Sequence, residues 1–367
     1  MRTENEVRVA SAAGRKVSAS GLQWLSSSVG SVPYTDARAG CDAILDRFPA
    51  FPTWPQLPRR SFLENMYVQF SERFPGVVLD MENKRIIVDR SRDLDGELEQ
   101  LYLAYLENDL EFAATSPEYA AGLAEFPQAV AERSTSPIAV KGQITGPVSW
   151  GLTVVDQNRR PVLYDDVLAD ALARHLRLKA AWQERELAKV CPQTVIFVDE
   201  PYMSSFGSAF VALQREQVIG LLEEVFGGIQ GLKGVHCCGN TDWSLLLETT
   251  VDVLSFDTYE YVEALSLYPE EVCSFLDRGG IIAWGITPKT DAVWEETAES
   301  LADRLEAALD LLARKGVPRE DMIAASLVTP SCGVGSLDEP AAERALSLTA
   351  AVADIMRERY GIGSQGE

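Results

Sequence analysis

Long hydrophobic runs are missing from this sequence. None of its 367 residues belongs to an apolar stretch of about 18 residues, the length that crosses a bilayer as a helix. The first seven residues, from Met1 to Val7, also lack the apolar core of a secretion signal. We therefore expect a cytoplasmic protein with no membrane partner.

Basic residues are few relative to acidic ones. The chain has 33 Lys and Arg against 55 Asp and Glu, so its formal net charge is −22. A field of this sign repels phosphate backbones and anionic lipid surfaces, so nucleic acid is not an expected partner. The remaining composition, with 46% hydrophobic residues, is that of a globular protein with a large core.

Histidine and cysteine are scarce, at two and six residues. The cysteines are unevenly spaced in a chain without a signal sequence, which favours reduced thiols or metal ligands over a disulfide framework. Cys41, Cys191 and Cys273 lie in helical surroundings or at helix ends, where we expect them to pack as small apolar residues. His175 lies close to Arg174 and Arg177, and we expect a solvent-exposed side chain there.

Strands and helices alternate regularly from residue 137 onward. Six strands are predicted, each followed by a helix, at Ile138–Lys141, Thr194–Val198, Gly234–Cys237, Val251–Phe256, Ile281–Trp284 and Met322–Leu327. The helices that follow them are predicted at 165–189, 214–225, 241–248, 261–277, 295–315 and 339–357.

The first 136 residues add two candidate strands, Leu22–Ser26 and the proline-rich Phe51–Pro58. Helices are predicted at 37–47, with Thr35 or Asp36 as its cap, and at 61–74, 93–114 and 117–132. Two β-branched segments around a polar turn, Val77–Asp80 and Arg85–Val88, predict a hairpin.

Eight strands that each precede a helix predict an α/β fold with a single (β/α)8 TIM barrel at residues 21–360, an N-terminal extension and an inserted hairpin. Residues 1–20 are predicted to be a flexible arm, and residues 361–367 a tail. An open doubly wound sheet alternates in the same way, but no G-x-G-x-x-G or Walker-type loop follows any predicted strand. The barrel is therefore favoured.

Metal-binding side chains follow the strand predicted at 234–237. Successive residues of an extended chain point to opposite faces, so His236 and Cys238 project together while Cys237 packs on the other side. A catalytic zinc ion needs three protein ligands. The last predicted strand leads to Cys332, which supplies the third, and Asp257 after the sixth strand is expected as an oxygen ligand or as a partner beside the ligands.

Polar groups at two other strand ends are candidates for substrate binding. Asp199 and Glu200 follow the fourth strand, where paired carboxylates suit an ammonium group, although a carboxylate there can equally cap the next turn. Gly30 and Ser31 follow the first strand. They form either a simple turn or a loop whose backbone amides receive a carboxylate.

These motifs resemble the catalytic domain of cobalamin-independent methionine synthase and related zinc-dependent corrinoid methyltransferases, within the uroporphyrinogen decarboxylase-like barrel superfamily. The resemblance rests on His236-Cys237-Cys238, Pro330-Ser331-Cys332-Gly333, Val29-Gly30-Ser31-Val32-Pro33, Thr145-Gly146-Pro147-Val148 and Val198-Asp199-Glu200-Pro201, in this order within residues 22–360 or so.

The resemblance implies a barrel in which zinc binds the thiol of an amino-acid acceptor. The zinc ligands correspond to His236, Cys238, Cys332 and, with aspartate in place of glutamate, Asp257. The acceptor's carboxylate would lie at Gly30 and Ser31, and its amino group at Asp199.

Three residues of the family pattern differ. The family's histidine after the seventh strand has no counterpart at 284–288, its folate-stacking tryptophan aligns near Thr153 beside Trp150, and a second carboxylate aligns near Arg60, with Glu64 the nearest acid. The methyl donor therefore stays open between a folate and a methylcorrinoid carried by a separate protein.

The functional hypothesis is a zinc-dependent methyltransferase that transfers a methyl group to a zinc-activated thiol such as homocysteine, in methionine biosynthesis. A free thiol is mostly protonated at neutral pH, whereas a metal-bound thiol is deprotonated. The alternatives are a lyase of the uroporphyrinogen decarboxylase type and a non-catalytic zinc- or corrinoid-binding protein. For the lyase, an arginine-rich N-terminal loop is absent, and Arg59-Arg60 is the nearest basic pair.

Overall fold

Six parallel strands form the central sheet of the computed structural model, which describes residues 21–208 and 211–363. In sheet order they are β3 Val140–Thr145, β5 Thr194–Asp199, β6 Leu232–Cys237, β7 Val253–Asp257, β8 Ile281–Thr287 and β9 Ser326–Pro330. All six predicted strands are confirmed, with shifted ends. The largest shift is at β9, because the predicted strand start at Met322 belongs to helix α12, Arg319–Ala324.

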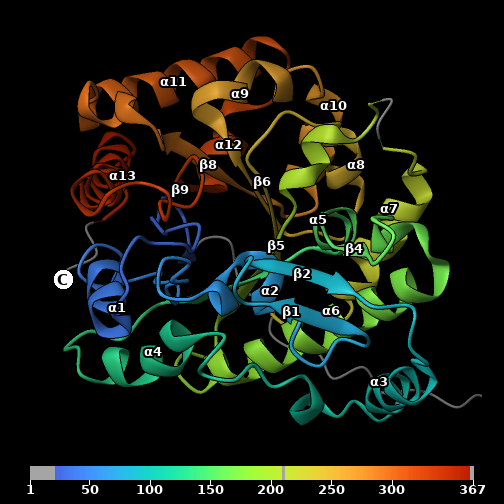
Figure 1. The fold of residues 1–367 in the computed structure, drawn as a ribbon. Coiled ribbons are helices and arrows are strands. Elements are labelled where there is room, and N and C mark those ends of the chain that lie inside the picture. Colours follow the sequence, from blue (N-terminus) through green and yellow to red (C-terminus); the bar gives the residue numbers. More distant parts are fainter. Residues whose placement is uncertain (1–20, 209–210, 364–367) are drawn as a thin grey trace, which may run out of the picture.

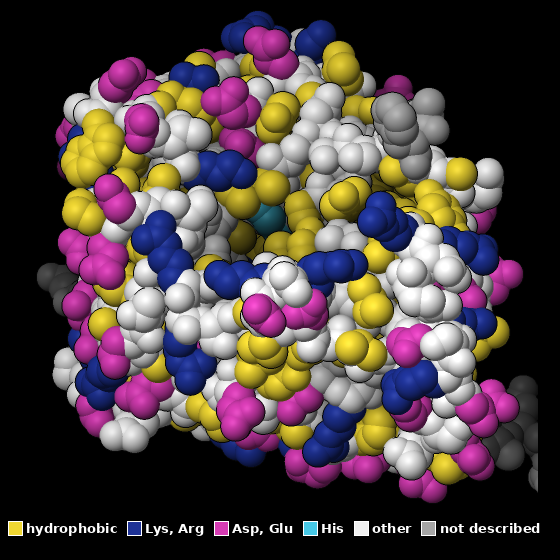
Figure 2. All heavy atoms as spheres, in the orientation of Figure 1, with side chains coloured by type: hydrophobic (Ala, Val, Ile, Leu, Met, Phe, Trp, Pro, Cys, Tyr) yellow, Lys and Arg dark blue, Asp and Glu magenta, His cyan; other side chains and the backbone are white. Residues whose placement is uncertain are grey.

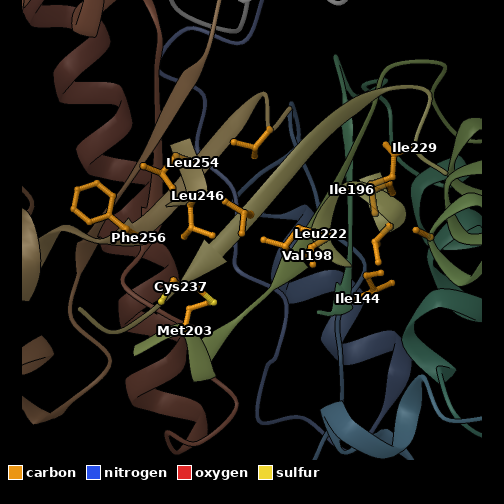
Figure 3. Close-up of a cluster of buried hydrophobic side chains, with 14 of the residues drawn as sticks. Ile144, Ile196, Val198, Met203, Leu222, Ile229, Cys237, Leu246, Leu254 and Phe256 are labelled. Carbon is orange, nitrogen blue, oxygen red and sulfur yellow. The ribbon is translucent and has the colours of Figure 1, made fainter. Parts of the chain in front are cut away.

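Alternate residues of these strands enter two separate cores. In β5, Val195 and Phe197 belong to a small cluster on the inner face of the curled sheet, while Ile196 and Val198 belong to the large cluster beneath the helices. Figure 3 shows part of the large cluster, with Val198 near Leu222 of helix α7, Arg215–Phe226, and Ile196 near Ile229. Burial on both faces explains why the strands are almost continuously apolar.

The first two predicted strands are not regular strands. Ser26 forms an isolated parallel bridge with Val328 of β9, and Thr53 forms one with Lys141 of β3, so the two segments extend opposite edges of the sheet. A further bridge joins Ser31 to Gln56. The predicted closed barrel of eight regular strands is therefore only partly formed among the described residues. The prolines at 52, 55 and 58 explain why the segment 51–58 forms no regular strand, because proline has no N–H group to donate to a neighbouring strand.

Helices cover the outer face of the sheet in Figure 1. The longest is α6, Asp166–Ala188. The predicted helix at 261–277 consists of two helices, α9 Thr258–Leu265 and α10 Pro269–Asp277. The break precedes Pro269, because proline is tolerated in the first turn of a helix but disrupts a helix interior. The other helices after β3 are α5 Pro147–Thr153, α8 Trp243–Glu248, α11 Ala298–Arg314 and α13 Glu339–Arg359, with 3-10 turns η4 Val162–Tyr164, η5 Pro201–Ser205 and η6 Asp291–Trp294.

The predicted hairpin is confirmed at β1 Val77–Asp80 and β2 Arg85–Val88, and β4 Val155–Asp156 adds a strand parallel to β2. Helix α1, Ala37–Leu45, begins as predicted, because the Asp36 carboxylate accepts a hydrogen bond from the Ala39 amide at 2.8 Å. The other N-terminal elements are η2 Phe62–Glu64, α2 Met66–Gln69, α3 Asp95–Glu107, η3 Leu110–Ala113 and α4 Ala121–Ala131.

The predicted exposure of His175 is wrong. Its side chain is 0% exposed on α6, because Phe74 packs edge-on against the ring and the imidazole Nε2 hydrogen-bonds the Phe70 carbonyl at 2.8 Å. Burial lowers the pKa of His175 to about 3, so the ring is neutral in the fold.

The predicted arm at residues 1–20 and the tail residues 364–367 lie outside the described residues. Among the helices that the structure describes, none combines the length and the hydropathy needed to cross a membrane.

Candidate metal centre

His236, Cys238 and Cys332 lie together, and one ligand atom from each is within 4.8 Å of the others. His236 belongs to the end of β6, Cys238 directly follows that strand, and Cys332 belongs to the loop after β9. Among the described residues they line a 370 Å³ cavity at the carboxyl ends of the strands, with Asp199, Ser31 and Glu64 in the same wall. Figure 2 shows a hollow with a histidine at its floor, apolar side chains around it and Lys and Arg at its rim. The predicted three-residue group is thus assembled.

Cys237 faces away from the cavity, as predicted. Its side chain is 0% exposed and belongs to the large core, where Figure 3 shows it near Met203. Burial raises the pKa of this thiol to about 12, so Cys237 stays protonated. Its role is packing.

The imidazole of His236 is held at one nitrogen. Its Nδ1 lies 2.9 Å from the Ser255 hydroxyl on β7, whereas Nε2 is buried without a hydrogen-bond partner among the described residues. A buried, unpartnered ring nitrogen beside two thiols fits a metal ligand, because a metal ion would satisfy it.

The two thiols differ in their acidity. A hydrogen bond from the Cys238 thiol lowers the pKa of Cys332 well below its usual range, and the nearby His236 and Lys289 act in the same direction. The pKa of Cys238 is raised by the same hydrogen bond. The pair therefore favours an anionic sulfur at Cys332, the form that binds metals.

Asp257 lies at the end of β7. Its Oδ1 accepts a hydrogen bond from the Glu260 amide at 3.0 Å and caps α9, and burial raises the pKa of the carboxyl to about 6. The structure does not group Asp257 with the three clustered ligands. Its role as a fourth zinc ligand stays a prediction.

Asp199 lines the cavity with one carboxylate oxygen free. Its Oδ1 is buried without a partner in the part of the chain that is described. Burial raises the pKa of Asp199 to about 6, while the buried ammonium of Lys141 acts against that shift. Lys141 itself donates to the Val29 carbonyl at 2.6 Å, and burial lowers its pKa to about 8. An unpaired acceptor in this wall suits an ammonium group.

Glu200 is placed differently from the predicted substrate contact. Its oxygens accept hydrogen bonds from the Val148 amide at 2.9 Å, the Ser149 amide at 2.7 Å and the Ser149 hydroxyl at 2.6 Å, at the start of α5. It is 0% exposed and does not line the cavity. Strand alternation, which separates Cys237 from His236, is the sequence signal that separates Glu200 from Asp199.

The Gly30-Ser31 loop borders the cavity. Gly30 has φ +148°, and a Cβ atom there would lie 2.8 Å from the Gln56 Oε1, so a side chain is not accommodated. The Gly30 amide faces the Ser28 hydroxyl at 3.3 Å, while Ser31 lines the cavity itself. Of the two, Ser31 is therefore the residue positioned to meet a ligand.

Glu64, the acid nearest to the aligned position Arg60, lines the cavity as a buried carboxylate. It accepts from the Arg60 guanidinium at 2.8 Å and from the Leu57 amide at 3.0 Å. Trp150 belongs to the hydrophobic core. Its side chain is 0% exposed, and its indole N–H donates a hydrogen bond to the Tyr67 carbonyl at 2.7 Å. Trp150 is therefore not available to stack on a ligand.

Sequence reasoning missed four residues of this site, namely Tyr67, Lys141, Ser255 and Lys289. Two of these residues had a sequence feature from which a place in the site could have been predicted. Lys141 interrupts an apolar strand, and Lys289 follows a predicted strand end, where a barrel places its functional side chains.

Comparisons with solved structures show a shared fold. A protein from Listeria monocytogenes, named as a vitamin-B12 independent methionine synthase, superposes with a TM-score of 0.53 at 14% identity, over 87% of this chain and 86% of that one. A methyltransferase from Methanosarcina mazei superposes with a TM-score of 0.52 at 13% identity, over 92% of this chain and 94% of that one. No known family and no curated protein matches the sequence.

Proposed function

We propose that this chain is a zinc-dependent methyltransferase on a (β/α)8-type barrel, which transfers a methyl group to a thiol such as homocysteine. The observation that carries the proposal is the cluster of one imidazole and two thiols within 4.8 Å at the cavity wall. The names of the two structural neighbours agree with a methyltransferase.

The three residues fit zinc in both chemistry and spacing. One nitrogen and two sulfurs form a catalytic-type set that leaves the fourth position open. Zn–S and Zn–N bonds of about 2.3 and 2.0 Å in a tetrahedron separate ligand atoms by roughly 3.5–3.8 Å, so ligand atoms within 4.8 Å need only a small adjustment. Bound zinc would supply a Lewis acid that keeps a thiol deprotonated at neutral pH.

The protein's own residues would then orient the acceptor. Asp199 offers its unpaired Oδ1 to an ammonium group, and Ser31 of the Gly30-Ser31 loop, which lines the same cavity, would meet a carboxylate. Asp257 would stand beside the fourth ligand position. An acceptor with a thiol for the zinc, an ammonium group for Asp199 and a carboxylate for the Gly30-Ser31 loop would match this arrangement. Homocysteine is such a molecule.

The methyl donor is either a 5-methyltetrahydrofolate-type molecule or a methylcorrinoid on a partner protein. Two features weigh against the folate: Trp150 is buried in the core, and Lys289 is the basic residue that follows the seventh strand, where the family has a histidine. We favour the methylcorrinoid.

Metal analysis and a methyl-transfer assay test the proposal. We expect about one equivalent of zinc in the purified protein and a large loss of zinc in Cys332→Ala, with Cys41→Ala as the matched control. Less than half an equivalent of zinc, unchanged by Cys332→Ala, would overturn the metal site.

Methionine formation from homocysteine is then measured with methylcobalamin and with methyltetrahydrofolate. Transfer from only one of them identifies the donor class. Zinc without any transfer would favour a non-catalytic zinc- or corrinoid-binding protein. Decarboxylation of a porphyrinogen would favour the lyase instead.

A further inference from the structure

Three side chains form a row across neighbouring strands. Asp199 of β5, His236 of β6 and Ser255 of β7 are consecutive Cα partners in the parallel register. Such partners point to the same face of a sheet, here the inner face, so Ser255 stands directly beside His236. Ser255 is 2% exposed, and its hydroxyl oxygen lies 2.9 Å from the imidazole Nδ1.

A neutral imidazole carries one hydrogen, so its two nitrogens cannot both be donors or both be acceptors. If Ser255 donated to Nδ1, Nε2 would carry the hydrogen and could not bind a metal ion. If Nδ1 donates to Ser255, Nε2 has a free lone pair, and Nε2 is the nitrogen that is buried without a partner among the described residues. The direction of this one hydrogen bond therefore decides whether His236 is a ligand.

The surroundings of Ser255 allow the second direction. When its oxygen accepts from His236, its own hydrogen needs another acceptor. Ser255 borders a small void of 10 Å³ together with Ser27 and Thr329, and the hydroxyl oxygens of both lack partners among the described residues. The Ser255 hydrogen can turn toward the part of this void that carries the two hydroxyls, while much of the remaining wall is apolar. Lys141 also borders the void, but its ammonium can only donate, so it cannot accept the Ser255 hydrogen.

We propose that Ser255 is a positioning residue, which accepts the Nδ1 hydrogen of His236 and thereby keeps Nε2 free to bind the metal. The inference rests on the proposed zinc site for its consequence, because a partner at the second nitrogen fixes the orientation of a ligand histidine and its loss costs about 10- to 100-fold in metal affinity.

The tautomer can be measured without metal. The chain has only two histidines, so an imidazole ¹⁵N spectrum of the zinc-free protein shows two rings. His175 is an internal reference, because its Nε2 faces a carbonyl and must carry the hydrogen. We expect the opposite, Nδ1–H tautomer for His236, and its loss in Ser255→Ala. His236→Gln assigns the signals.

Zinc affinity is then measured by competition with a chromogenic chelator. We expect a 10- to 100-fold loss in Ser255→Ala, recovery in Ser255→Thr, and no change in the control Cys41→Ala. An Nε2–H tautomer in the wild-type protein overturns the inference, as does equal zinc affinity in Ser255→Ala. A wild-type protein that binds no zinc contradicts the proposed function instead, while the tautomer still tests Ser255.

Discussion

Replacing Glu200 with glutamine separates a structural role of this residue from the predicted substrate contact. Its two carboxylate oxygens accept three hydrogen bonds from Val148 and Ser149, and the Ser149 hydroxyl in turn accepts from the Tyr202 amide at 3.0 Å. Glutamine keeps one acceptor oxygen but places an NH₂ group where the second carboxylate oxygen accepts. At least one donor then faces another donor.

The size of the effect follows from these contacts. Burial raises the pKa of Glu200 to about 7, so its carboxylate is charged above that pH. There a hydrogen bond to the charged group contributes about 1.5–3 kcal/mol, and a buried donor left unpaired costs about 1–3 kcal/mol. Loss of one or two bonds predicts destabilisation by about 2–4 kcal/mol. For a chain of 367 residues this lowers Tm by roughly 3–5 °C, since the unfolding entropy scales with length.

Thermal unfolding and urea denaturation of Glu200→Gln measure this loss, with the exposed Glu295→Gln as the matched control. At a temperature where the variant stays folded, we expect little change in the KM for the thiol. Unchanged stability together with a raised KM would refute the reasoning and restore Glu200 as a substrate ligand.

Two further predictions concern other buried groups. The pKa of His175 is about 3 in the fold against about 6.5 in the unfolded chain, so stability should fall as pH drops below about 6.5, by up to ~1.4 kcal/mol per unit. The free energy of unfolding, measured by urea denaturation at pH 5 and at pH 7.5, should differ less between the two pH values in His175→Phe than in the wild-type protein. An equal difference in the two proteins would contradict the prediction. Asp199→Asn should raise the KM for an amino-acid thiol at least ~10-fold, leaving zinc content and transfer to an amine-free thiol unchanged; equal KM values would exclude the ammonium contact.

The side-chain positions of neighbouring residues were predicted correctly in one motif and only in part in another. Strand alternation correctly separated His236 from Cys237, and the same rule applies to Asp199 and Glu200. The pairing of carboxylates at that strand end nevertheless favoured a shared role. The partners of Glu200 come from α5, a helix that sequence patterning did not predict because it is short and begins with Gly146-Pro147.

Proline and burial account for the main errors in the fold. The segment at 51–58 makes only isolated bridges, since its prolines cannot donate to a ladder. His175 lies near two arginines in sequence, yet the segment that carries Phe70 and Phe74 covers its face of α6. Local polarity is a poor guide to burial where an insertion folds back over a helix.

The sequence by itself indicated the alternation of strands and helices and the three candidate ligands, because hydrophobic patterning and side-chain direction along an extended strand are local properties of the chain. Only the tertiary structure decided which atoms those ligands meet. Ser255 reaches His236 across 19 residues of sequence, and Lys141 lies near Asp199 across the inside of the curled sheet. Such contacts depend on the register between strands, which the packing of the whole core sets.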